Sequence, residues 1–262
     1  MIGFIGGGNM AEALIKGLTQ NRHRDIIFYD PSEQRVKHLM IKYGVGFVGS
    51  NIEVIKRSSI VILAVKPQTI SQVLEEIKTE VRPQQIIVSI AAGIKIGYIS
   101  GLLSTNRVIR VMPNMPAMFE QGMSVISVSD GVLPDEVQSI VDIFKTVGEA
   151  VVMDESMMDA VTALSGSGPG FFAYIVEAFI RSAMHLGLTQ QDAYLLTIQT
   201  FIGTAKVLQS GLTPERLREM VTSPNGTTYA GLNVLRQGGI DDIILSTLMS
   251  AKNRAEELGS SR

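Results

Sequence analysis

The feature that most constrains the fold is an alternation of short β-branched runs and amphipathic segments that stops near residue 153. The apolar runs lie at 2–5, 26–29, 46–48, 60–65, 86–90, 108–111, 124–128 and 150–153. Helical patterns lie between them at 10–20, 32–43, 69–80 and 134–146. This order predicts βαβ units on a mostly parallel sheet. The run at 60–65 is apolar on both faces, which is typical of a central parallel strand.

After residue 154 the strand pattern ends and only helical patterns follow. They lie at 155–164, 169–186, 190–209, 214–222, 227–237 and 240–258. Thr189 and the pair Thr213–Pro214 are typical helix starts. The segment 171–184 is apolar nearly all round, so we expect it to be buried in a bundle core or against another subunit. We therefore predict an α/β chain with a Rossmann-type dinucleotide-binding domain at 1–153 and an all-helical domain at 154–262.

A glycine-rich turn follows the first predicted strand. Its sequence GGGNMA fits G-x-G-x-x-A with Gly6, Gly8 and Ala11. Gly6 permits a tight turn, Gly8 lets a pyrophosphate approach the backbone, and Ala11 keeps the next helix close to the sheet. The helix N-terminus then offers free N–H groups to the phosphates. The pattern predicts dinucleotide binding, and the alternative is a turn with a structural role alone.

The second predicted strand ends at Asp30, 22 residues after Gly8. A carboxylate at this place can accept a hydrogen bond from the ribose 2′-OH, which favours NADH. Ser32 and Arg35 offer the opposite choice, because they can bind the 2′-phosphate of NADPH if Asp30 turns away. In a third interpretation the segment Asp30–Ser32 only caps the following helix.

Composition excludes several classes of protein. Cysteine is absent, so disulfides, thiol catalysis and Cys-based metal sites are excluded. The net charge of −2 argues against nucleic-acid binding. No uninterrupted apolar run approaches the ~20 residues of a membrane span, and the N-terminus lacks the features of a secretory leader, so we expect a cytoplasmic protein without a membrane partner.

Histidine is rare, with His23, His38 and His185 in positions that favour structural or solvated roles. No spacing typical of a metal site occurs, so no metal is expected. A reductase without a catalytic imidazole suits an imine substrate, because a protonated C=N is already electrophilic and the cofactor carries the hydride chemistry.

Three further segments lie where ligands bind. Ala64–Gln68 and Arg110–Pro116 follow predicted strands, at the edge of the sheet where open α/β folds hold ligands. Ser223–Thr228 lies between two predicted helices, where backbone N–H groups can form an anion cradle. Ordinary capping by Thr227 or Thr228 explains the last segment equally well. The glycine-rich segment 164–170 is interpreted as a hinge without a hydrolase pattern.

These segments together resemble the pyrroline-5-carboxylate reductase family. The matching stretches are IGFIGGGNMAEALIKGL, AVKPQ, RVMPNMPA, ALSGSGPGFFAYIVEA, the QT..GTAKVL stretch at 199–208, and LREMVTSPNGTTYAGLNVL. They occur in the family's order and span nearly the whole chain. The resemblance implies reduction of 1-pyrroline-5-carboxylate to L-proline, the last step of proline biosynthesis, with NADPH or NADH. It also implies a homodimer through the helical domain, with dimers often forming decamers.

The resemblance also implies site residues. The substrate carboxylate is held by Ser223, Asn225, Gly226, Thr227 and Thr228, and the Thr228 hydroxyl lies near the ring nitrogen as the catalytic group. With the glycine-rich turn included, the predicted cofactor site comprises Gly6, Gly8, Asn9, Met10, Asp30, Asn51, Ala64, Val65, Lys66, Pro67, Met112, Pro113 and Asn114.

Two residues depart from the family pattern. Asn225 stands where the family usually has glycine, and Met115 replaces a threonine. Asparagine tolerates a positive φ better than most residues, so the turn can persist. Three alternatives remain: a reductase of a related cyclic imine, a β-hydroxy-acid dehydrogenase, and a non-catalytic dinucleotide-binding regulator. The dehydrogenases place a lysine and an asparagine on the first long helix after its glycine-rich turn, and this chain has neither in GPGFFAYIVEAF.

Overall fold

The protein divides into two compact units. The computed structural model describes residues 1–23 and 25–260, so the last two residues of the predicted helical domain lie outside the described residues. The first unit comprises Met1–Ser167 together with the C-terminal segment from Ser250, and the second comprises Gly168–Met249. The packing thus changes after Ser167, because residues 154–167 still pack on the first unit.

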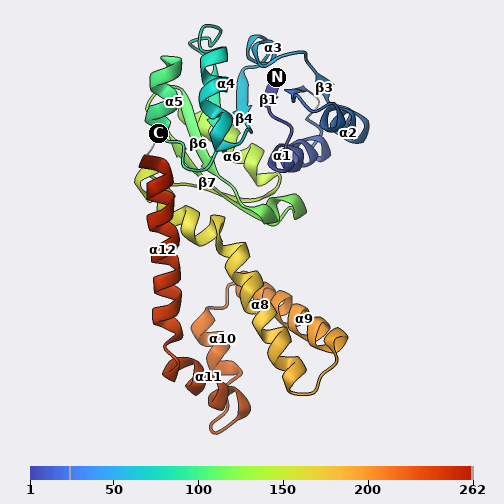
Figure 1. Ribbon diagram of the computed structural model, residues 1–262, viewed down its shortest axis with the longest axis vertical. Coiled ribbons are helices and arrows are strands. Elements are labelled where there is room, and N and C mark those ends of the chain that lie inside the picture. The colour runs from blue at the N-terminus through green and yellow to red at the C-terminus, as the bar shows by residue number, and fades with distance from the viewer. Residues whose placement is uncertain (24, 261–262) are drawn as a thin grey trace. The chain divides into compact units, whose positions relative to one another are not determined.

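A single sheet forms the centre of the first unit. Its strands are β1 (Ile2–Ile5), β2 (Ile26–Tyr29), β3 (Gly46–Phe47), β4 (Ile60–Leu63), β5 (Ile86–Ser89), β6 (Val108–Met112), β7 (Gly122–Val128) and β8 (Gly148–Val152). Within the described residues they form one eight-stranded sheet in the order β3-β2-β1-β4-β5-β6-β7-β8 (Figure 1). Neighbouring strands are parallel except for the antiparallel pair β6–β7. The predicted, mostly parallel sheet is confirmed.

Helices cover both faces of this sheet. On one face lie α1 (Asn9–Gln20), α2 (Glu33–Tyr43) and α6 (Pro134–Lys145), which pack with Phe4 and Phe28. On the other lie α3 (Asn51–Arg57), α4 (Ile70–Ile77) and α5 (Ile96–Leu103). In β4, Ile62 points to the first face, and Val61 and Leu63 point to the second. The central strand is therefore apolar on both faces, as its sequence predicts.

The helical pattern does not predict α3 and α5. Both are short, with seven and eight residues. Gly97 and Gly101 lower the helix propensity of α5. Packing of Val54, Ile55 and Ile99 against the sheet stabilises these two helices instead.

The segment after β8 is not one regular helix over 155–164. It consists of a 3₁₀ turn at Glu155–Met157, the short α7 (Met158–Val161) and a π-helical turn at Thr162–Gly166. Met158 and Val161 pack on Val125 of β7, which explains why this segment belongs to the first unit. The predicted hinge at 164–170 is therefore helical, and the boundary between the two units falls inside it.

The second unit is helical throughout. It contains α8 (Gly168–His185), α9 (Gln190–Gln209), α10 (Pro214–Met220), α11 (Thr227–Gln237) and the first part of α12 (Ile240–Ser260). Thr189 accepts a hydrogen bond from the backbone N–H of Asp192, and Thr213 accepts one from Arg216. Both predicted helix starts are confirmed.

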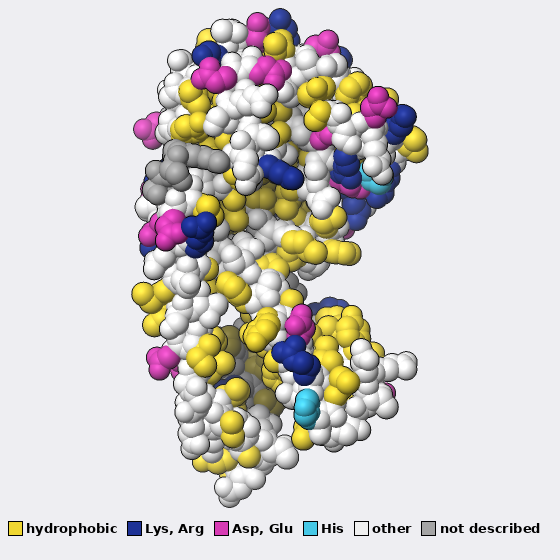
Figure 2. Space-filling view, in the orientation of Figure 1, with side chains coloured by type: hydrophobic (Ala, Val, Ile, Leu, Met, Phe, Trp, Pro, Cys, Tyr) yellow, Lys and Arg dark blue, Asp and Glu magenta, His cyan; other side chains and the backbone are white. Residues whose placement is uncertain are grey.

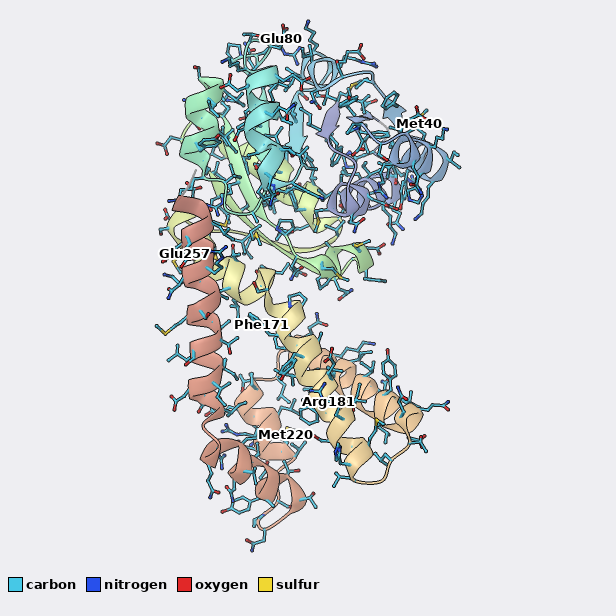
Figure 3. The ribbon with its side chains drawn as sticks, in the orientation of Figure 1. Met40, Glu80, Phe171, Arg181, Met220 and Glu257 are labelled. Carbon is cyan, nitrogen blue, oxygen red and sulfur yellow. The ribbon has the colours of Figure 1, made fainter. Side chains whose placement is uncertain are left out.

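The apolar helix α8 is largely exposed within this single chain. The exposed fractions are 59% for Phe172, 67% for Tyr174 and 56% for Phe179. Figure 2 shows hydrophobic side chains gathered on the surface of this unit, and Figure 3 shows the side chains along α8, with Phe171 and Arg181 labelled. Of the two predicted places for this helix, a bundle core within one chain is wrong. An exposed apolar face of this kind is typical of a subunit interface.

Candidate functional site

The strand order places a crevice at the carboxyl ends of β1 and β4. The chain runs from β1 outward to β3 on one side, and from β4 outward to β8 on the other. This reversal is the topological switch point, where open α/β sheets bind their ligands. Gly6 follows β1 and Ala64 follows β4, and the N–H of Ala64 donates to the carbonyl of Ile5 over 2.8 Å.

Gly6 and Gly8 have different structural roles in the turn after β1. Gly6 has a φ of +96°, and a Cβ there would lie 2.6 Å from the carbonyl oxygen of Ala64. Gly8 is exposed and precedes α1, and among the described residues no heavy atom lies within 4 Å of its Cβ position. The space above Gly8 and the free N–H groups of α1 fit a pyrophosphate.

Asp30 supports this turn directly. Its Oδ2 accepts a hydrogen bond from the backbone N–H of Gly7 over 2.7 Å, and its Oδ1 accepts one from Ser32 over 2.8 Å. Ser32 is the N-cap of α2, and its hydroxyl accepts a hydrogen bond from the N–H of Arg35. The carboxylate therefore binds the glycine-rich turn, which sequence reasoning missed, and it also lies at the end of β2 as expected for a group near the ribose.

Arg35 also faces the turn. Its Nε donates to the carbonyl of Gly7 over 2.6 Å, and its Nη2 donates to the carbonyl of Gly8 over 3.3 Å. The same Nη2 lies 2.8 Å from Oε2 of Glu12 on α1.

Glu12 collects four donors from α2, and sequence reasoning did not single it out. Besides Arg35, its other oxygen lies 2.8 Å from His38 Nε2, 3.1 Å from Lys42 Nζ and 2.9 Å from the Tyr43 hydroxyl. Burial alone raises the pKa of Glu12, but the hydrogen bonds from these groups outweigh it and lower the pKa to about 2. Glu12 is therefore ionised throughout the physiological range. The contacts span 23 to 31 residues, so no local motif marks them.

The remaining predicted cofactor residues of the first unit differ in exposure and bonding. Lys66 is exposed and begins the 3₁₀ turn Pro67–Thr69, and Val65 and Pro67 are partly buried beside it. At the start of α1, Asn9 is exposed and Met10 packs partly against the core.

Asn51 is 8% exposed at the first residue of α3. Its side-chain Nδ2 donates to Oε2 of Glu76 over 2.8 Å, so the NH₂ group of this amide has a structural partner.

The loop after β6 is fixed by Asn114. Its Nδ2 donates to the carbonyl of Ser165 in the π-helical turn over 3.0 Å, and its Oδ1 accepts from the N–H of Met123 over 2.8 Å. Pro113 is buried and Met112 is partly buried. This amide thus ties the loop to the π-helical turn, a geometry often found at functional sites.

The turn at Ser223–Thr228 lies in the second unit. Asn225 has a φ of +57°, which confirms that asparagine adopts the left-handed conformation here. The N-cap of α11 is Gly226, so neither Thr227 nor Thr228 caps the helix. The capping interpretation is wrong, and the first amides of α11 have no side-chain cap. Such a helix end binds an anion such as a carboxylate.

No group of three or more His, Cys, Asp or Glu in the described part of the chain is arranged to hold a metal ion.

Comparisons with known proteins cover both units. A family model described as pyrroline-5-carboxylate reductase dimerisation matches residues 155–258. A second, described as NADP oxidoreductase coenzyme F420-dependent, matches residues 1–93. The pyrroline-5-carboxylate reductase of Methanosarcina acetivorans is 40% identical over 98% of this chain and 97% of its own length.

The chain belongs to the pyrroline-5-carboxylate reductase family.

Solved structures of family members have the same fold. The pyrroline-5-carboxylate reductase from Coxiella burnetii is 34% identical and superposes with a TM-score of 0.94, covering 98% of this chain and 97% of that one. The Plasmodium falciparum pyrroline carboxylate reductase, solved with NADP bound, is 25% identical with a TM-score of 0.86 over 98% and 97% of the two chains. The protein is an NAD(P)H-dependent oxidoreductase of this family, and the predicted Rossmann-type and helical domains are confirmed.

The dimerisation match begins at residue 155, next to the predicted domain boundary. It includes the whole stretch Glu155–His185, which is long and apolar enough to cross a membrane by length and composition alone. Its alanine, valine, leucine, isoleucine and phenylalanine residues raise the average hydropathy, but serine, glycine and charged residues interrupt it, so it contains no uninterrupted apolar run of the length of a membrane span. The match to the dimerisation model supports homo-oligomerisation, and α8, with its exposed apolar face, lies within the matched residues.

Proposed function

We propose that this protein reduces 1-pyrroline-5-carboxylate to L-proline, the last step of proline biosynthesis. The observation that carries the proposal is that one chain, 40% identical to a named reductase of this imine, contains both a glycine-rich turn at a switch point and a helix start without a side-chain cap.

The first unit holds the cofactor through the turn around Gly8 and the N-terminus of α1. Asp30 accepts from the ribose 2′-OH, and the loops around Ala64–Pro67 and Met112–Asn114 line the nicotinamide end. Residues 1–153 thus act as the cofactor domain. When bound, the nicotinamide supplies the hydride that the imine carbon receives.

The second domain, residues 154–262, binds the substrate. The uncapped amides at the start of α11, with Ser223, Asn225 and Gly226, bind the carboxylate and so orient the C=N bond. The Thr228 hydroxyl donates a hydrogen bond to the ring nitrogen. This positions the imine without an imidazole, which fits the structural contacts of His38 and His185.

Steady-state oxidation of NADH and of NADPH, with pyrroline-5-carboxylate as acceptor, tests the proposal. Turnover with either cofactor is expected. Binding of a cofactor without turnover would contradict it and favour the non-catalytic regulator. Turnover with a different cyclic imine at a higher kcat/KM would favour the related reductase.

We also propose a cytoplasmic homodimer through the helical domain that assembles further into a decamer, without a membrane or nucleic-acid partner. An apolar groove of about 610 Å³ between α8 and α9, lined by Phe172, Phe179 and Phe201 among others, supports burial against a second copy. The molar mass in solution from light scattering checks this, and a monomer would contradict it.

A further inference from the structure

Arg35 occupies a position from which NADPH is commonly recognised. It lies in the first turn of α2, just beyond the end of β2, where an arginine can accommodate the 2′-phosphate. In this chain its guanidinium instead donates to the carbonyls of Gly7 and Gly8 and to Glu12. The side chain is 27% exposed, so most of it faces the turn.

Glu12 holds the guanidinium in this orientation. Its side chain is 12% exposed, and it accepts from Arg35 through one oxygen and from three further groups of α2 through the other. A carboxylate with this many donors fixes α2 against α1. If the Arg35 side chain rotated toward a 2′-phosphate, Oε2 of Glu12 would lose its ion pair with the guanidinium. The carbonyls of Gly7 and Gly8 would each lose a hydrogen-bond donor.

We propose that Glu12 and Arg35 are positioning residues that together hold the glycine-rich turn, and that their pairing withholds Arg35 from the 2′-phosphate of NADPH. This inference rests on the proposed cofactor role of the turn. A guanidinium bonded to two successive carbonyls fixes their peptide planes, so the amides that face the pyrophosphate are already oriented before the cofactor binds. Both NADH and NADPH benefit equally from that support.

Glu12 also sets the net charge of the side chains near the proposed ribose position. With Glu12 ionised, the charges of Arg35 and Lys42 are compensated. Neutralising Glu12 leaves these cations uncompensated and frees Arg35 to move. The 2′-phosphate of NADPH then gains more binding energy from these cations than the 2′-hydroxyl of NADH does, so the loss of Glu12 should favour NADPH.

The test measures the dissociation constants of NADH and NADPH by nicotinamide fluorescence, without any imine. The variants are Arg35→Ala, Arg35→Lys and Glu12→Gln. The matched control is Glu33→Gln, which also removes one negative charge. Glu33 lies on α2, is 90% exposed and pairs with Lys37. Thermal melts establish that each variant is folded. If Arg35→Ala does not fold, Arg35→Lys replaces it as the test variant.

Arg35→Ala should weaken NADH and NADPH binding by a similar factor, about tenfold, because hydrogen bonds to a charged group are lost. Arg35→Lys should weaken binding less, and again by a similar factor for NADH and NADPH. Glu12→Gln should shift the NADPH-to-NADH affinity ratio by ~3- to 5-fold toward NADPH, the size of one charge interaction near the protein surface. Glu33→Gln should leave the ratio unchanged.

The inference is overturned if Arg35→Ala weakens NADPH alone, because Arg35 would then bind the 2′-phosphate. It is also overturned if Glu12→Gln shifts the ratio no more than Glu33→Gln does. Because no imine is present, these outcomes are independent of the proposed reaction. A wild-type protein that binds both cofactors but reduces no imine would contradict the proposed function and leave this test valid.

Discussion

The backbone N–H of Gly7 donates to Oδ2 of Asp30 over 2.7 Å, across 23 residues of sequence. The carboxylate that ends β2 is thus bonded to the turn that ends β1. Because β1 and β2 are parallel neighbours, their carboxyl ends meet at one edge of the sheet, and this bond fixes the turn at the switch point. We therefore expect Asp30 to affect cofactor binding in two ways, through the ribose and through the turn.

Replacing Asp30 with Ser should shift cofactor preference toward NADPH. The substitution removes the acceptor for the ribose 2′-OH and the negative charge that opposes a 2′-phosphate, so the NADPH-to-NADH ratio of kcat/KM should rise about tenfold, comparable with one charged hydrogen bond. It should also cost about 1–3 kcal/mol of stability, because the N–H of Gly7 loses its partner. Steady-state kinetics and urea denaturation measure both effects. Asp25→Ser, at the exposed start of the same strand, is the control, and an unchanged ratio would remove Asp30 from ribose recognition.

Gly6→Ala and Gly8→Ala should separate folding from cofactor binding. A Cβ at Gly6 meets the Ala64 carbonyl at 2.6 Å on a backbone with φ +96°, so Gly6→Ala should cost several kcal/mol, ~4 or more, or prevent folding. A Cβ at Gly8 meets no described atom within 4 Å, so Gly8→Ala should leave the melting temperature nearly unchanged. It should weaken cofactor binding about tenfold or more, because the methyl group occupies the approach of the pyrophosphate. Equal melting temperatures for the two variants would contradict these separate roles.

Thr228→Ala should lower kcat/KM by about 10²-fold, within the range for positioned proton transfer. The helix start remains intact, since Gly226 and not Thr228 is the N-cap of α11. The far-UV circular dichroism and the cofactor affinity should therefore match the wild type. Thr227→Ala is the matched control, and we expect it to lose less activity. Wild-type kinetics in Thr228→Ala would exclude Thr228 from the mechanism.

Glu12 should make stability depend on pH in the acid range. Its pKa falls from the ordinary 4.5 to about 2 in the folded protein, so its contribution is complete above about pH 5 and is lost as the pH falls toward 2. That contribution is at most about 3 kcal/mol. Glu12→Gln should thus be destabilised relative to wild type at pH 7, and the difference should shrink at pH 4 and again at pH 3. Urea midpoints at these pH values measure the difference, with Glu33→Gln as the control. If the difference in stability between wild type and Glu12→Gln did not change with pH, the contacts of the ionised Glu12 carboxylate would not stabilise the fold.

Residues near each other in the chain determine many features of this protein. The runs at 2–5 and 60–65 become β1 and β4, because β-branched residues favour strands and two apolar faces require burial. The turn after β1 requires glycine at residue 6, and Thr189 begins a helix through a bond to a residue three positions later. The positive φ of Asn225 follows from the same kind of local preference.

The partners of the site residues were decided only by the tertiary structure. Asp30 bonds to Gly7, Arg35 to Glu12 and Asn114 to Ser165 across 23, 23 and 51 residues. Sequence spacing does not encode such pairs, because they depend on which strands are neighbours and on the direction of each side chain. The exposure of α8 has the same origin: its composition predicts burial, but whether its own chain or a second copy covers it depends on how the chain packs.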